Sequence, residues 1–163
     1  MEGSDGMTIR SFDWRKIRPA RKIHCFLYSV GLGPIIGGII LLLTTTGRKS
    51  GQKRVTPLQY EEIDGKFFLG SARGIHADWY KNIAANPRVE LRVKNVRFPG
   101  TAELVTNPSR IADFLEIRLS RHPFMIGLLM QKMHGLPKKP SREQLEKLAS
   151  SEAMIVVTRT DRR

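Results

Sequence analysis

The order of apolar and polar positions predicts a chain built mainly from short antiparallel strands. Short runs rich in β-branched and aromatic residues are separated by turn residues, among them Asp64-Gly65, a two-residue hairpin signal, and Lys94-Asn95. The predicted strands are 38–46, 54–63, 67–72, 88–93, 97–105 and 153–160.

A small number of helices is predicted between these strands. One begins near Asp78 and ends at Asn86-Pro87, a second runs from Asn107-Pro108 to about Arg118, and a third covers 141–150. Residues 120–139 mix apolar positions with a loop rich in proline and lysine. Hairpins with few crossing helices predict a protein that is mainly β with α, a small antiparallel barrel of about six to seven strands with peripheral helices.

The N-terminal part has a different pattern. Residues 10–30 interleave aromatic and basic side chains, so 1–33 is predicted as a basic amphipathic helical segment and 34–163 as the barrel domain. Residues 26–43 are uncharged, but Pro34 and the surrounding glycines disfavour a membrane-spanning helix. Two interpretations stay open for the segment: it lies on an anionic membrane surface, or it caps the open end of the barrel.

The charge balance changes the picture of the partners. Twenty-eight Lys and Arg against fifteen Asp and Glu give a net charge of +13, which favours anionic partners. A nucleic-acid partner is disfavoured, because the cations are spread along the chain and accompany no reading motif. The single cysteine, Cys25, excludes an intramolecular disulfide, and a cytoplasmic location, peripheral to the inner face of the membrane if the N-terminal segment binds lipid, is expected.

Common catalytic signatures are missing. The sequence has no G-x-G-x-x-G, Walker A or G-x-S-x-G motif, and its four histidines have neither metal-site spacing nor acidic neighbours. We therefore expect no metal site and no nucleophilic hydrolase.

Two stretches are candidates for anion binding. The first is "TTTGRKSGQKR" (44–54), where turn amides and the cations Arg48, Lys49 and Arg54 could hold a phosphate or carboxylate. Strand alternation then places Arg54 and Thr56 on one face and Pro57 on the other, with Pro57 indicating an edge strand. The second stretch, "GSARG" (70–74), directly precedes a helix that carries Asp78, Trp79 and Asn82. Trp79 would either wall a flat ring or belong to the core.

These motifs, taken in order, resemble the deazaflavin-dependent nitroreductase family. The resemblance rests on "LTTTGRKSGQKRVTPL" (43–58), the Asp64-Gly65 hairpin, "SARG" (71–74) and "WYKNIAANPRVELRV" (79–93). It covers about residues 40–105 closely and implies a split β-barrel of the FMN-binding type. It also implies the deazaflavin coenzyme F420, whose tail carries a phosphate and several glutamates.

The resemblance further implies roles for individual residues. Arg48, Lys49 and Arg54 would hold the anionic tail. Thr56, Pro57 and Ser71 would border the deazaflavin ring, and Trp79 and Asn82 would complete its pocket, with Asp78 beside them. The full set of implied cofactor-binding residues is Arg48, Lys49, Gln52, Arg54, Thr56, Pro57, Ser71, Ala72, Asp78, Trp79 and Asn82.

One departure from the family concerns the acceptor side. Members that reduce nitroimidazoles carry tyrosines there, whereas this chain has no tyrosine after Tyr80. His122 is the polar substitute, so Trp79 and His122 are the predicted catalytic residues, and "FMIGLLM" (124–130) would either form an apolar wall or pack as a helix on the barrel. The resemblance thus implies hydride transfer to a hydrophobic acceptor, quinone-like or nitro. An FMN-using oxidoreductase and a non-enzymatic fatty-acid binder remain alternatives, and a homodimer is compatible with the fold.

Overall fold

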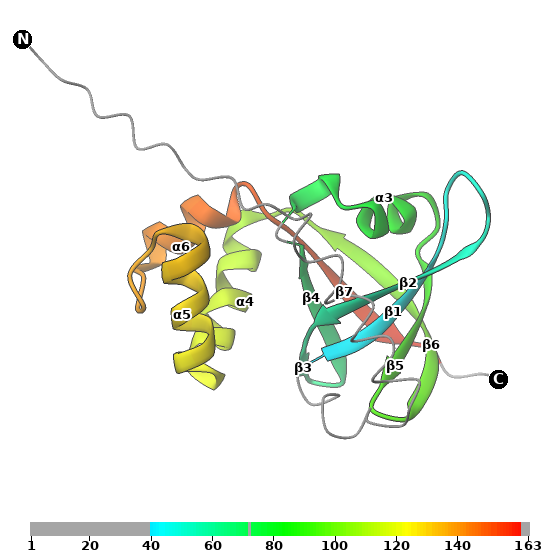
Figure 1. Cartoon of the computed structure of the whole chain (residues 1–163), viewed down its shortest axis with the longest axis horizontal. Helices are drawn as coiled ribbons and strands as arrows, with labels where there is room; N and C mark the ends of the chain where they lie inside the picture. Colours follow the sequence, from blue (N-terminus) through cyan, green and yellow to red (C-terminus); the bar gives the residue numbers. More distant parts are fainter. Residues whose placement is uncertain (1–39, 72, 161–163) are drawn as a thin grey trace, which may run out of the picture.

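The computed structural model describes residues 40–71 and 73–160. The strands of this part form one antiparallel sheet of seven strands in the order β2-β1-β5-β6-β7-β4-β3 (Figure 1). This sheet confirms the predicted split β-barrel with peripheral helices. The strands are β1 (Ile40–Thr46), β2 (Lys53–Gln59), β3 (Glu61–Ile63), β4 (Lys66–Ser71), β5 (Arg88–Val93), β6 (Val96–Val105) and β7 (Ala153–Arg159).

The barrel shape follows from the connection between β2 and β3. These strands are the two edges of the sheet, yet Tyr60 alone separates them in sequence. A continuous extended segment can reach from one edge to the other only if the sheet curls. Tyr60 is 9% exposed, and its ring centroid lies 6.0 Å from that of Phe67, so the closure point is part of the core.

The hairpin turns have the backbone that the sequence predicts. Asp64 and Gly65 both have positive φ, 50° and 72°, as a type I′ turn between β3 and β4 requires. Lys94, with φ of 54°, occupies the turn between β5 and β6. The registers of both hairpins are fixed by these turns and by alternate burial on the strands.

The barrel interior is filled by one face of each strand together with residues of the helix α3 (Asp78–Ala85). Leu43 of β1 lies opposite Leu91 of β5, and both are fully buried. The 3₁₀ turn η2 (Gly74–His76) precedes α3, which lies across one end of the barrel beside the β1–β2 hairpin (Figure 1). The interior cluster includes Leu41, Leu43, Phe67, Leu69, Trp79, Tyr80, Ile83, Leu91, Phe98, Ile155 and Val157.

Three further helices gather on one side of the barrel: α4 (Pro108–Arg121), α5 (Pro123–His134) and α6 (Arg142–Ala149) (Figure 1). They form a lobe with its own apolar core, which also takes Met154 and Val156 from the outer face of β7. Phe68 of β4 stacks on Phe114 of α4 with ring centroids 6.1 Å apart. The lobe therefore covers the outer face of the β3-β4-β7 part of the sheet.

The helix α5 was not clearly predicted, because its apolar residues are not confined to one stripe. It begins with Pro123, which suits a first helical position. It ends at Gly135, whose φ of 65° is the left-handed conformation that glycine favours. By contrast, α6 has a complete capping box between Ser141 and Gln144, and the sequence predicts its start correctly.

The predictions for the N-terminal segment, residues 1–33, fall outside the described residues. In the part of the chain that is described, no helix is long and apolar enough to cross a membrane.

A carboxylate is buried where the lobe meets the barrel. The side chain of Glu152 is 11% exposed, and its Oε1 lies 3.9 Å from Nε2 of His134. Burial raises the pKa of Glu152 to about 7, although the charge of Arg118 opposes this shift. At pH values between the ordinary pKa of 4.5 and about 7, the Glu152 carboxyl keeps its proton in the folded chain and loses it in the unfolded chain.

Removing this carboxylate should change how stability depends on pH. The free energy of unfolding contributed by Glu152 falls as pH rises from about 4.5 to 7. We compare the free energy of unfolding of Glu152→Gln with that of the wild type, measured by urea unfolding at pH 5 and at pH 8. We expect the difference to shift in favour of the variant by about 2–3 kcal/mol from pH 5 to pH 8. Glu143→Gln on the exposed side of α6 is the control for losing one charge. An equal stability difference at both pH values would contradict the assignment.

Candidate functional site

The turn between β1 and β2 is compact and depends on its glycines. The amide of Gly47 donates to the carbonyl of Gln52 at 2.7 Å, and the amide of Gly51 donates to the carbonyl of Gly47 at 2.8 Å. Gly51 has φ of 66°. A side chain at Gly47 would place its Cβ 3.0 Å from Oγ of Ser50 and 3.2 Å from the carbonyl of Gln52. The cations of this stretch are therefore held on a defined turn.

Arg48 is fixed against α3. Its backbone amide donates to Oδ1 of Asn82 at 3.2 Å, and its Nη1 donates to the same oxygen at 3.0 Å. Its Nη2 donates to Oδ1 of Asp78 at 3.1 Å, where the Asp78 side chain is 79% exposed. The helix thus orients the guanidinium, while the exposed ion pair itself adds little stability.

Asn82 connects this turn to the barrel. It is 4% exposed, and its Nδ2 donates to Oγ1 of Thr45, which is 2% exposed, at 3.2 Å. One buried amide therefore bonds the β1 strand through Thr45 and the turn through Arg48. Because a buried amide without partners is costly, these bonds favour one arrangement of α3 and the hairpin.

The remaining cations of the hairpin are available to bind an anionic ligand. Lys49, Lys53 and Arg54 are exposed, and none of them forms an ion pair with a described residue. Their positive charges stand next to Arg48, which in the described part of the chain pairs with the single carboxylate of Asp78. The hairpin is therefore a cluster of cations with a deficit of acids, which suits a ligand with several negative charges.

The register of β2 separates two of the predicted ring contacts. Arg54 lies opposite Thr45, and Thr56 lies opposite Leu43, so Arg54 and Thr56 share the face that borders the barrel interior. Pro57 lies on the other face, on an edge strand as predicted. Thr56 and Pro57 therefore project to opposite sides of β2 and do not border one space with their side chains.

A hydrogen bond from the end of β4 holds the loop that precedes α3. Ser71 is 3% exposed, and its Oγ donates to the carbonyl of Gly74 at 2.8 Å. Gly74 has φ of 54°, and a Cβ there would lie 2.7 Å from the carbonyl of Ser151. Ala72 is outside the described residues. Ser71 thus has a structural partner, and its contact with a ring remains a prediction.

Trp79 lies in the barrel core. It is 9% exposed, and its ring centroid lies 6.0 Å from that of Tyr80 in an edge-to-face arrangement. Gln52 is exposed at the end of the turn. The structure therefore brings Arg48, Asp78 and Asn82 together with Thr45, and places Lys49, Gln52, Arg54 and Thr56 on the adjoining hairpin.

His122 belongs to a different cluster. It joins α4 to α5, and its Nε2 lies 3.2 Å from Oε1 of Glu61, whose side chain is 6% exposed. Arg121 approaches the other oxygen of Glu61 at 3.2 Å, and Nε of Arg118 lies 3.7 Å from Oε1. None of these contacts involves the Arg48 network. Burial lowers the pKa of Arg118, and Glu61 opposes that shift.

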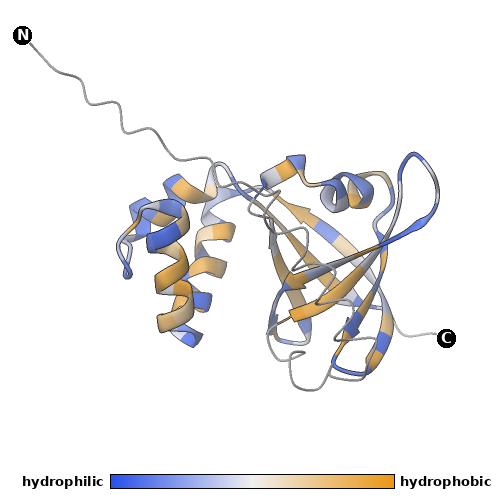
Figure 2. Cartoon of the chain, in the orientation of Figure 1, coloured by the Kyte–Doolittle hydropathy of each residue, from blue (hydrophilic) through white to orange (hydrophobic). Residues whose placement is uncertain are grey.

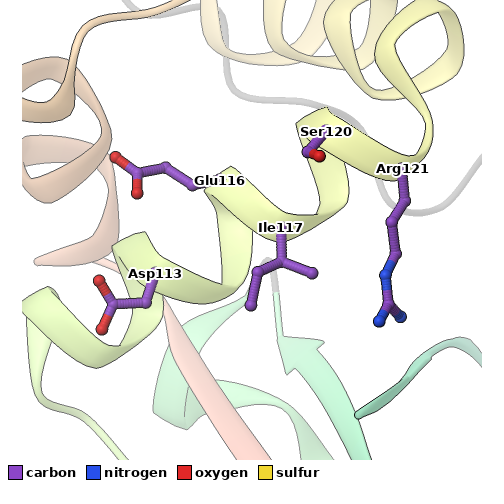
Figure 3. A pocket seen from close by; sticks show the side chains of 5 residues that line it. All are labelled: Asp113, Glu116, Ile117, Ser120 and Arg121. Carbon is purple, nitrogen blue, oxygen red and sulfur yellow. The ribbon is translucent and has the colours of Figure 1, made fainter.

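An open groove runs along α4. It is lined by Asp113, Glu116, Ile117, Ser120 and Arg121 (Figure 3). Its charged side chains already have partners: Arg142 binds both Asp113 and Glu116, at 2.6 and 3.1 Å, and Arg121 binds Glu61. Figure 3 shows the two carboxylates directed away from Arg121. The groove is therefore a weaker ligand site than the hairpin. No group of three potential metal ligands occurs among the described residues.

The sequence patterns do not indicate Thr45, Glu61 or Arg118. Thr45 is the middle of three consecutive threonines, and only the strand register shows that its hydroxyl points to Asn82. Glu61 and Arg118 are 57 positions apart in sequence. Their pairing depends on the lobe packing against β3, and no local signal in the sequence indicates it.

The fold is that of a split-barrel protein whose β1–β2 hairpin carries a cluster of exposed cations. Residues 27–123, more than half of the chain, match the profile of the F420H(2)-dependent quinone reductase family. The chain therefore belongs to this family.

The chain is also similar to curated relatives and to solved structures. Over 68 residues, 40% of this chain and 46% of each relative, it is 40% identical to an F420H(2)-dependent quinone reductase in two strains of Mycobacterium tuberculosis. The match thus spans less than half the length of these curated relatives. A solved F420-H2 dependent reductase is 27% identical, with a TM-score of 0.49 over 72% of this chain and 92% of that chain. A conserved hypothetical protein of Mycobacterium tuberculosis, 16% identical over 81% of this chain and 80% of its own, shares the fold with a TM-score of 0.51.

The Glu61 cluster yields a prediction about stability. Glu61→Gln would leave the buried guanidinium of Arg118 without its nearest carboxylate, and we expect a loss of about 3 kcal/mol in the free energy of unfolding. Arg121→Gln is the matched control, because the Arg121 side chain is 44% exposed and should cost under about 1 kcal/mol. Urea unfolding measures both. Equal, small losses would show that the buried pair contributes no more than the exposed one.

Proposed function

We propose that the protein is an F420-dependent oxidoreductase that transfers a hydride from the reduced deazaflavin to a hydrophobic acceptor of the quinone class. Membership of the quinone reductase family supports this function. The observation that carries it is the hairpin, where Lys49, Lys53 and Arg54 have no carboxylate partner among the described residues and stand beside an oriented Arg48.

The residues of the hairpin fit the anionic tail of the cofactor. That tail carries a phosphate and several carboxylates, and each would replace water around a lysine or arginine with a charge-assisted hydrogen bond. Arg48 would present a guanidinium whose direction Asn82 and Asp78 already fix, so less freedom is lost on binding. FMN carries a single phosphate and would use fewer of these cations.

The chain's own residues would orient and shield the flat ring. When bound, the reduced deazaflavin supplies the hydride, and the protein provides position and a dry surface. Thr56 lies on the barrel-facing side of β2, and α3 holds Trp79 at the same end of the barrel. Because Trp79 is 9% exposed, we expect it to support the ring pocket from beneath rather than to cover it.

The acceptor class is argued from the family and from chemistry. A quinone accepts a hydride and one proton from water to become a hydroquinone, so no catalytic acid–base pair is needed on the protein. Quinone-dependent oxidation of reduced F420 by the purified protein tests this step, with a nitroimidazole as a second acceptor. If the protein binds the reduced cofactor but neither acceptor supports its oxidation, the reductase activity is contradicted.

Removing the hairpin cations should weaken cofactor binding. We expect Arg48→Ala and Arg54→Ala each to raise the Kd for oxidised F420 about tenfold, since each loses a charge-assisted contact. Tryptophan fluorescence quenching measures binding, and the salt dependence of Kd should become shallower in both variants. Arg97→Ala removes an exposed cation of β6 as the matched control. If Arg48→Ala and Arg54→Ala bind F420 with the same Kd as the wild type and the Arg97→Ala control, the hairpin is not the site of the tail.

Asn82 should act through Arg48, which a double-mutant cycle can show. We expect Asn82→Ala to raise the Kd for F420 by about fivefold to tenfold, and to have no further effect once Arg48→Ala is present. A deazaflavin that lacks the phosphate and glutamate tail is the control ligand, and its affinity should be unchanged by Asn82→Ala. Additive effects, or an equal loss of affinity for the tail-less ligand, would mean that Asn82 contacts the ring instead.

A further inference from the structure

The exposed side of α5 combines an aromatic side chain with free cations. Phe124 is 81% exposed, more than any other large apolar side chain of the described residues. Leu128 follows one turn later and is half-buried, whereas Met125 and Leu129 pack against the core of the lobe. Phe124, Leu128 and Lys132 are spaced by four residues and share one side of the helix.

The loop that follows α5 brings two more lysines to this side. The backbone of Lys138 packs against the helix, because a Cβ on Gly127 would lie 2.9 Å from the Lys138 carbonyl. Gly127 is one turn from Phe124, so the loop that carries Lys138 and Lys139 returns to the helix near the exposed ring. We call the surface formed by Phe124, Leu128, Lys132, Lys138 and Lys139 the α5 face.

The charge of the surrounding sequence is entirely of one sign. Residues 117–142 contain six Lys and Arg and no Asp or Glu. The three arginines of this stretch, Arg118, Arg121 and Arg142, are paired with carboxylates from other segments. By contrast, the three lysines form no ion pair with a described residue and are exposed. Figure 2 shows α5 itself as a predominantly hydrophobic helix.

We propose that the α5 face docks on the surface of an anionic lipid bilayer. An exposed aromatic ring can enter the interface between headgroups and acyl chains, and free lysines around it are attracted by anionic headgroups. The lack of carboxylates in this stretch removes the repulsion that acidic side chains would cause at such a surface. A protein partner would need a patch that is both acidic and apolar and matches the shape of the α5 face. An anionic bilayer presents negative headgroups and apolar acyl chains over its whole surface, so it needs no such match. The proposal rests on the α5 face and not on the proposed oxidoreductase activity.

Vesicle flotation of the full chain tests the proposal. We expect binding to phosphatidylcholine vesicles that contain phosphatidylglycerol, and much weaker binding to phosphatidylcholine alone or at raised salt. Phe124→Gln should lower the partition coefficient about tenfold, since it removes the inserted ring. Lys138→Gln with Lys139→Gln should lower it at least about tenfold, from the lost attraction of two lysines.

Matched controls separate this face from charge and apolarity elsewhere. Val96→Gln removes a residue that is 56% exposed at the start of β6, and Lys94→Gln with Lys147→Gln removes two exposed lysines from other surfaces. Both controls should bind like the wild type. The proposal is overturned if the wild type does not bind anionic vesicles, or if Phe124→Gln binds as tightly as Val96→Gln. Self-association that Phe124→Gln abolishes, without any vesicle binding, would instead assign the face to a second copy of the chain.

Discussion

The arrangement of the candidate site depends on the hydrogen bonds of the Asn82 side-chain amide. Its oxygen accepts from both the backbone and the guanidinium of Arg48, and its nitrogen donates to Thr45 inside the barrel. A buried amide that lost these partners would cost about 1–3 kcal/mol. The hairpin, α3 and the barrel mouth are therefore coupled, and the charge of Arg48 is presented in one direction before any ligand arrives.

This coupling is possible because of how the barrel closes. Tyr60 alone links the two edge strands, so the sheet curls and α3 covers the end of the barrel next to the β1–β2 hairpin. The lobe of α4, α5 and α6 packs on the outside of the same sheet and uses its own charged cluster around Glu61. The two clusters have different physical roles: one leaves cations available to solvent, while the other pairs its cations with a buried carboxylate.

Much of the fold could be predicted from local patterns. The Asp64-Gly65 turn, the strand 88–93 and the capping box at Ser141 are all encoded within a few residues. The helix α5 was only one of two interpretations left open for 124–130, because its apolar residues are not confined to one stripe. The Glu61–Arg118 pair was missed because its members meet only after the lobe packs on β3. The alternation of faces on β2 was predicted correctly, and it places the side chains of Thr56 and Pro57 on opposite sides of the strand. Arg48 and Asn82 were both identified, but their direct hydrogen bond required the structure.

The most direct test of the cationic hairpin as the cofactor site is a titration of the purified protein with oxidised F420 at low salt, followed by tryptophan fluorescence, with FMN titrated in parallel. We predict saturable binding of F420 in the micromolar range, weakened by salt, and markedly weaker binding of FMN. Tight FMN binding without F420 binding would assign the site to a flavin with a single phosphate. Binding of neither, by a folded protein, would contradict the assignment of the cationic hairpin to the cofactor tail.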